Sequence, residues 1–281
     1  MNKPILHKPQ RILLYKEGDL NGMNVERVGQ YLTEKTGVPF QLRGDIYERL
    51  PIEKMEGLAF RFAKVRVKGL GRGFTPGTPL PAEVDYEKRR IQTPHWKVIG
   101  IHYEGIFYQQ AISELVLRET LDQDSCFILF TNQLFGTWGW DDRRYHVIAS
   151  LYGFPNMISV SGLVEAPAKP KSFYLKRQMG LSKESLQEIY QGRFLVHGDP
   201  WLEEVAKGYA MQAFFFYLIG NPFCEDRHCR LFNSHWQEEL LHCQLGGTYE
   251  YCPEHEEMLR ALKRKSHSKK NKGGGNYGSP S

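Results

Sequence analysis

Two pairs of potential metal ligands near the C-terminal end constrain this chain more than any other feature. Cys224 and Cys229 form the first pair, and Cys252 and His255 form the second. Each pair lies on loop-like sequence, and a segment of helical character separates the pairs. Thiolate and imidazole ligands with this spacing are typical of a tetrahedral zinc site. Because four protein ligands would leave no open position for water, the pattern predicts a structural zinc ion.

The composition predicts a cytoplasmic protein with one substantial hydrophobic core. The chain has 281 residues, of which 41% are hydrophobic, enough for one large domain or two closely packed lobes. Its five cysteines are odd in number and mostly clustered, which argues against a disulfide framework and favours a reducing compartment. We see no secretory signal at the N-terminus, and the longest apolar run is too short for a membrane span. We therefore expect no membrane contact.

The positive charge of the chain is concentrated in its last residues. The formal net charge is +5, but removing residues 263–272 leaves 31 basic and 32 acidic side chains. The basic residues of that segment are Lys263, Arg264, Lys265, Lys269, Lys270 and Lys272. Such a composition cannot bury enough apolar surface to order itself, so residues 263–281 are predicted to form a basic disordered tail. A tail of this kind can make weak contacts with nucleic acid.

The periodicity of apolar residues predicts an α/β (α+β) fold with a mixed sheet. Residues 11–15 and 38–42 have strand character, and the helical segment between them ends at Gly37, so a β-α-β unit opens the chain. A Gly- and Pro-rich loop, a helix and three strands are then expected, at residues 65–81, 107–121, 126–130, 145–151 and 157–162. Further on, a loop and two helices are expected at 166–171, 182–190 and 200–219. We expect residues 1–197 to form the sheet subdomain and residues 198–262 a helix with a zinc-binding subdomain.

Residues 199–259 resemble the archaemetzincins, which are zinc metallopeptidases of the metzincin clan. The family motif HExxHxxGxxHC lies on a helix that turns at the glycine, and its last cysteine begins a second zinc site. Gly220 and Cys224 match this motif with the spacing intact, and Cys229 continues it. Cys252 and His255 take the place of the family's final C-x-x-C, with His255 replacing a cysteine. The resemblance implies a metzincin-like sheet, an active-site-type helix and a small C-terminal zinc subdomain.

The same alignment places no catalytic ligand at the motif positions. The first zinc histidine falls on Ala213, the catalytic glutamate on Phe214, the second histidine on Tyr217 and the third on Phe223. Hydrolysis of this type needs three imidazoles for zinc and a carboxylate that takes a proton from water. The resemblance therefore implies a metallopeptidase-like protein that has lost catalysis and retains one structural zinc ion. We expect the old substrate cleft to accept an extended peptide along an edge strand.

Two other functions remain open at this point. His235 and His242 lie seven residues apart on a segment of helical pattern, and with His228 and Cys243 they offer a relocated metal site for an active metal-dependent hydrolase. A solvated helix face beside the zinc subdomain explains the same spacing. The second alternative is a zinc-knuckle protein that binds nucleic acid through its basic tail. Two bound zinc ions would favour the hydrolase, and salt-dependent binding that requires the tail would favour the nucleic-acid protein.

Overall fold

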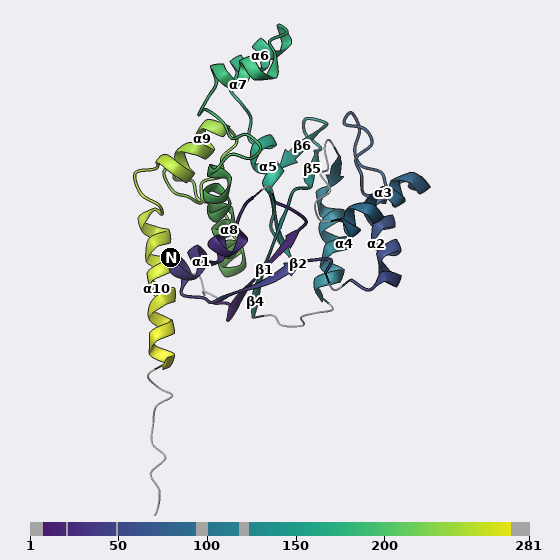
Figure 1. Cartoon of the computed structure of the whole chain (residues 1–281). Coiled ribbons are helices and arrows are strands. Elements are labelled where there is room, and N and C mark those ends of the chain that lie inside the picture. Colours follow the sequence, from purple (N-terminus) through teal and green to yellow (C-terminus); the bar gives the residue numbers. More distant parts are fainter. Residues whose placement is uncertain (1–7, 21, 49, 94–100, 118–123, 271–281) are drawn as a thin grey trace, which may run out of the picture.

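The computed structural model describes residues 8–20, 22–48, 50–93, 101–117 and 124–270 (Figure 1). Its strands are β1 (Arg11–Glu17), β2 (Phe40–Asp45), β3 (His102–Glu104), β4 (Ser125–Thr131), β5 (Leu134–Gly139), β6 (Arg144–Ile148), β7 (Ser150–Leu151) and β8 (Asn156–Ser159). Its helices are α1 (Val25–Thr36), α2 (Ile52–Lys64), α3 (Pro81–Gln92), α4 (Gly105–Leu117), α5 (Val160–Glu165), α6 (Lys171–Gln178), α7 (Lys183–Ile189), α8 (Trp201–Ile219), α9 (Gln237–Leu241), the π-helical turn η1 (His242–Gly246) and α10 (Pro253–Lys270). Within the described residues, none of the helices has the length and apolar character that a membrane span requires.

The central sheet has five strands in the order β2-β1-β4-β8-β7. The first four run parallel, and β7 at the edge runs antiparallel to β8. β1, α1 and β2 form the expected β-α-β opening, with Ile12 opposite Phe40. A smaller sheet has the order β3-β5-β6, in which β3 is parallel and β6 antiparallel to β5. The predicted α/β class with a mixed sheet is confirmed.

Helices cover both faces of the central sheet, and each face has its own hydrophobic core (Figure 1). Successive side chains of a strand point to opposite faces. Ile12 and Leu14 of β1 therefore pack with α1, α8 and α10, whereas Leu13 and Tyr15 pack with α2, α3 and α4. The core around α8 reaches from Ile12 to Leu262, so the two expected subdomains share it. This arrangement brings the C-terminal metal ligands against the main body of the protein.

Helix α8 forms the centre of the first core. Its start is stabilised by Asp199, whose side chain accepts a hydrogen bond from the backbone N–H of Trp201 at 2.9 Å. Most of its residues are buried and apolar, as in a helix that packs on several sides. It ends at Gly220, which caps the helix with a φ of 73° in the left-handed region. A glycine adopts this conformation without the steric cost that other residues meet, so the expected helix end is confirmed.

One expected strand is shorter than the sequence pattern indicated. We expected residues 157–162 to be extended, but β8 ends at Ser159 and residues 160–165 form helix α5. The side-chain oxygen of Ser159 accepts a hydrogen bond from the backbone N–H of Gly162 at 2.8 Å. This is N-terminal capping, for which serine is well suited. The β-branched residues around Ser159 concealed that capping signal.

Several helical segments were not expected from the sequence, among them α2, α3, α6 and α10. Residues 171–178, directly after the Pro-rich loop, form α6, which packs with α7 around Phe173. Helix α10 continues to Lys270, so residues 263–270 are helical rather than part of a disordered tail. Leucine, lysine and arginine are good helix formers, and they extend a helix that has already started at lower cost than they would nucleate one. Residues 271–281 lie outside the described part of the chain.

Candidate metal centre

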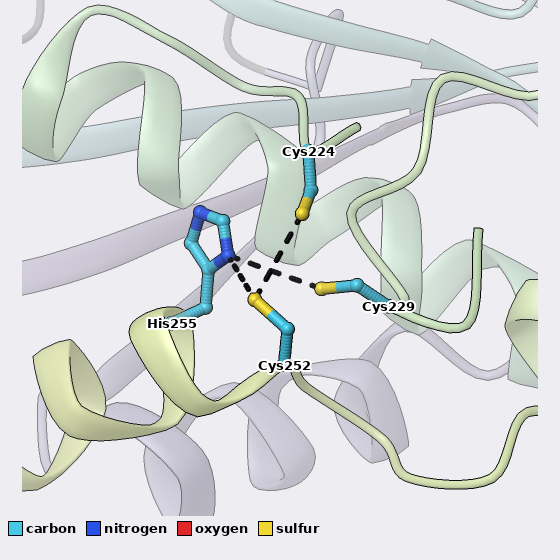
Figure 2. A group of neighbouring side chains, drawn as sticks. All are labelled: Cys224, Cys229, Cys252 and His255. Carbon is cyan, nitrogen blue, oxygen red and sulfur yellow. Dashed lines mark hydrogen bonds between the residues drawn. The ribbon is translucent and has the colours of Figure 1, made fainter. Parts of the chain in front are cut away.

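Four side chains of the C-terminal region converge on a common point (Figure 2). One ligand atom from each of Cys224, Cys229, Cys252 and His255 lies within 4.8 Å of every other. The Sγ atoms of Cys224 and Cys252 are 3.8 Å apart, and two sulfur ligands of a tetrahedral zinc ion are separated by about 3.8 Å. The Nδ1 atom of His255 lies 3.0 Å from the Sγ atom of Cys252 and 3.9 Å from that of Cys229. These values bracket the separation of about 3.6 Å between a sulfur and a nitrogen ligand.

The first half of the ligand set lies on the loop after α8. The backbone N–H of Cys224 donates to the carbonyl of Leu231 at 2.9 Å, and that of Cys229 donates to the carbonyl of Asp226 at 3.0 Å. The backbone N–H of Asp226 points at the Sγ atom of Cys224 at 3.4 Å. The loop thus turns back on itself between the two cysteines. An N–H group directed at sulfur favours the thiolate form that a metal requires.

The second half of the ligand set lies at the start of α10. Cys252 is the residue before the helix and His255 is the third residue within it. Side chains at these two positions lie on the same side of a helix start, as in a capping box. Pro253 at the first helical position fixes the backbone there. The His255 ring also packs edge-on against Phe215 of α8, with 5.0 Å between ring centroids, so α8 supports this half of the centre.

Burial controls the protonation of these ligands when no cation is bound. Burial raises the pKa of the Cys229 thiol well above its usual range and also raises the pKa of Cys224. Burial lowers the pKa of His255, so its imidazole is neutral at physiological pH and offers a lone pair. Three thiols within bonding reach of one point can ionise together only if a cation compensates their charge. The donor set of three sulfurs and one imidazole fits zinc, and it matches structural sites with four protein ligands.

The alternative ligands do not assemble into a second centre of this kind. Nε2 of His242 lies 3.0 Å from Nδ1 of His228, so these two residues do come together. Across the described residues, however, no other group of three or more His, Cys, Asp or Glu ligands is as close as the Cys224 cluster. Cys243 is buried and its Sγ atom lies 3.3 Å from the hydroxyl of Ser234. His235 precedes α9, which begins only at Gln237, so it does not share the helix face assumed from the spacing.

The motif positions on and after α8 are filled by apolar and aromatic side chains. Ala213 and Phe214 have no exposed surface, and Tyr217 is half-buried on the same helix. Phe223, just past the helix end, is 36% exposed. Alanine and phenylalanine carry no group that binds a metal or accepts a proton. The helix includes positions 213–217 as expected, and Ala213 and Phe214 are buried core residues, as the alignment indicated.

Tyr152 completes this aromatic region, and the sequence patterns gave no indication of it. It follows the edge strand β7, and its hydroxyl donates to Oε1 of Gln212 at 2.6 Å. Its ring lies 5.8 Å from Phe216 and 5.7 Å from Phe223, between centroids. The contact joins the end of the edge strand to α8, over 60 positions of the sequence. No local pattern could have predicted a contact at that separation.

The fold and the cluster together define a mixed α/β protein in which three cysteines and one histidine, next to α8, could hold a metal ion. The chain belongs to the family described as "Probable metallopeptidase family (DUF6775)", whose sequence model matches residues 8–262. Among solved structures, it is similar to the crystal structure of a zinc-dependent peptidase from Methanocorpusculum labreanum. That similarity has 12% sequence identity, covers 90% of this chain and 99% of the other, and has a TM-score of 0.43. No curated protein matches the chain.

Proposed function

We propose that this chain is a catalytically inactive member of its metallopeptidase family, of the archaemetzincin type. The observation that carries this proposal is the filling of the motif positions. Ala213 and Phe214 are fully buried in α8, where hydrolysis would need a zinc-bound imidazole and a general base. A buried apolar side chain stabilises this helix, whereas an unpaired polar cavity in its place would destabilise it.

The proposal includes one structural zinc ion at the Cys3His centre. Cys224 and Cys229 would hold it from the loop after α8, and Cys252 and His255 from the start of α10. Zinc in such a site crosslinks the two segments, and its binding free energy adds to the folding free energy. Four protein ligands leave no position at which water could be activated. The role that follows is structural.

We also propose that the region beside the edge strand binds an extended peptide. β7 is the last strand of the central sheet, and an outer strand can pair with a peptide through main-chain hydrogen bonds. The aromatic rings of Tyr152, Phe216 and Phe223 lie next to this strand. They offer a surface on which an apolar side chain of the peptide could pack.

A peptide-library assay tests the loss of catalysis. We expect the purified chain to show no chelator-sensitive cleavage above background, and the same result for the double variant His235→Ala/His242→Ala. That variant separates a relocated metal site from a contaminating protease. If the wild type shows chelator-sensitive cleavage and the double variant does not, the proposal of an inactive protein is wrong. The alternative of an active metal-dependent hydrolase then replaces it. The bound metal is measured in the same samples, and one zinc ion per chain is expected.

A further inference from the structure

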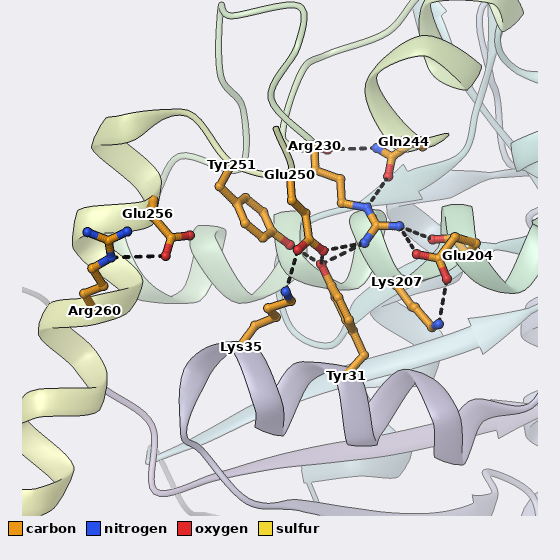
Figure 3. A network of polar contacts seen from close by, with 10 residues as sticks. All are labelled: Tyr31, Lys35, Glu204, Lys207, Arg230, Gln244, Glu250, Tyr251, Glu256 and Arg260. Carbon is orange, nitrogen blue, oxygen red and sulfur yellow. Dashed lines mark hydrogen bonds and ion pairs between the residues drawn. The ribbon is translucent and has the colours of Figure 1, made fainter. Parts of the chain in front are cut away.

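Arg230 is a buried cation at the centre of a polar network (Figure 3). It is 3% exposed. Its Nη1 group donates to the hydroxyl of Tyr31 at 2.9 Å and to the carboxylate of Glu250 at 2.7 Å. Its Nη2 group donates to both the backbone carbonyl and the carboxylate of Glu204. Its Nε group donates to the side-chain oxygen of Gln244 at 3.3 Å, so all the N–H donors of the guanidinium have an acceptor.

The partners of Arg230 come from separate elements of the fold. Tyr31 lies on α1, Glu204 on α8 and Gln244 in η1, and Glu250 lies just before α10. Lys35 of α1 forms an ion pair with Glu250, and Lys207 of α8 forms one with Glu204. Arg230 is therefore fixed to the body of the protein on several sides. A lysine could not replace it, because only the planar guanidinium offers donors in this many directions.

The network is directly connected to both halves of the metal centre. Arg230 follows Cys229 in the sequence, and Glu250 and Tyr251 precede Cys252. The backbone N–H of Arg230 donates to the carbonyl of Glu250 at 2.9 Å. The hydroxyl of Tyr251 also contacts that of Tyr31. The side chain and the main chain of Arg230 thus join the segment that carries one pair of ligands to the segment that carries the other.

We propose that Arg230 is the positioning residue of the metal centre, and that it sets the zinc affinity by holding both ligand pairs in place before the ion binds. The inference rests on the proposed zinc site. Without the network, the two segments would have to be ordered when zinc binds, and that cost would reduce the affinity. Groups that orient metal ligands without touching the metal have effects of this kind.

The chain offers a matched control for a purely stabilising role. Arg90 is also buried, at 5% exposed, and it also pairs with two carboxylates, those of Glu17 and Glu87. It lies on α3, on the opposite face of the central sheet, where it stacks on Phe62 of the core on that face and reaches Glu17 of β1. Loss of its side chain should destabilise the fold without reaching the metal ligands.

The test compares Arg230→Met with Arg90→Met in the full chain. The zinc dissociation constant is measured by competition with a chromophoric chelator, and the thiolate-to-cobalt absorption of the Co²⁺ form reports whether the ligand set is intact. We expect Arg230→Met to weaken zinc binding by at least about tenfold, which is the usual range for groups that support metal ligands. Arg90→Met should change the zinc dissociation constant by less than about twofold, although we expect thermal unfolding to show that both variants are destabilised.

Each outcome decides whether Arg230 positions the metal ligands or only stabilises the fold. An unchanged zinc affinity in Arg230→Met, or an equal loss in both variants, overturns the inference. If Arg230→Met does not fold, Glu250→Gln removes one charge of the same network and should weaken zinc binding several-fold. Unchanged binding in that variant also overturns the inference. A wild-type chain that binds no zinc refutes the proposed function and the inference together, whereas tight binding in both wild type and variant refutes the inference alone.

Discussion

At the scale of single residues, the ligand pair at the start of α10 follows from helix geometry. Cys252 precedes the helix and His255 is its third residue, and side chains at these positions face each other at any helix start. The sequence analysis predicted this pair from its spacing but placed it on loop-like sequence, whereas the structure places it at a helix start. The same reasoning misplaced His235, because it assumed a helix that extends further toward the N-terminus than α9 does. A ligand assignment from spacing depends on where the helix begins.

Substitution of one ligand should show that metal binding contributes to folding. Cys224→Ser should abolish tight zinc binding and lower the unfolding free energy by roughly 3 kcal/mol or more, a size associated with lost metal sites. Cys243→Ser is the control, because Cys243 is also buried and lies outside the ligand set. Thermal unfolding with and without a chelator measures the stability of each variant and how much of it depends on bound metal. Chelator sensitivity that persists in Cys224→Ser, or disappears in Cys243→Ser, would contradict the assigned ligands.

At the scale of elements, α8 carries the positions that the resemblance assigns to a catalytic motif. Its motif positions are part of the main core, since Phe214 packs with residues of the sheet and of α10. The apolar character of this helix was evident from the sequence, and so was its end at Gly220. The contact between Tyr152 and Gln212 was not evident from the sequence, because it depends on how the edge strand β7 approaches α8.

Restoring one polar group to this helix should be costly. Phe214→Glu places a carboxylate where the structure has no exposed surface, so we expect a loss of more than about 4 kcal/mol or failure to fold. Phe214→Leu keeps the site apolar and should cost about 1–2 kcal/mol. Urea unfolding followed by circular dichroism measures the unfolding free energy of both variants. A glutamate variant as stable as the leucine variant would show that the position can accept the catalytic residue.

The end of α8 can be tested through its backbone conformation alone. An added Cβ meets nothing within 4 Å at either Gly220 or Gly57, but only Gly220 has a positive φ, of 73°. Gly220→Ala should therefore destabilise the protein by about 1 kcal/mol. Gly57→Ala, in the exposed interior of α2, should stabilise it by about 0.5–1 kcal/mol. Equal effects of the two substitutions in denaturant titrations would contradict the left-handed cap.

At the scale of the whole molecule, the sequence predicted the α/β class with a mixed sheet, but neither the order of the strands nor the second sheet. Residues 12–15 of β1 and all residues of β4 are buried in continuous runs, as in a sheet that helices cover on each face. The hydrogen-bond partners of Arg230 could not be predicted from the sequence. The hydrogen bond of Arg230 to Tyr31 spans 199 positions, and no periodicity of the sequence specifies a partner at that distance. Only the packed fold brings these groups together.

The network also predicts how stability depends on pH. The pKa values of Glu204 and Glu250 are lowered because Lys207, Lys35 and Arg230 oppose and outweigh the effect of burial. A lowered carboxyl pKa stabilises the folded state above the unfolded value of about 4.3, and this contribution is lost as the pH falls through the folded value. Wild type should therefore be more stable than Glu250→Gln at pH 7, and the difference should shrink as the pH falls below about 4.3 and disappear only below the lowered folded-state pKa. Urea titrations at several pH values measure this difference. A difference that stays constant between pH 7 and acidic pH would contradict the lowered pKa of Glu250.

The central claim is that one zinc ion is held by three thiolates and one imidazole while the peptidase position remains without metal. X-ray absorption at the zinc edge measures this directly on the purified full chain. The account predicts one zinc ion per chain, with three sulfur ligands at about 2.3 Å and one nitrogen ligand at about 2.0–2.1 Å. A ligand shell of nitrogen and oxygen, or a second zinc ion with such a shell, would contradict it.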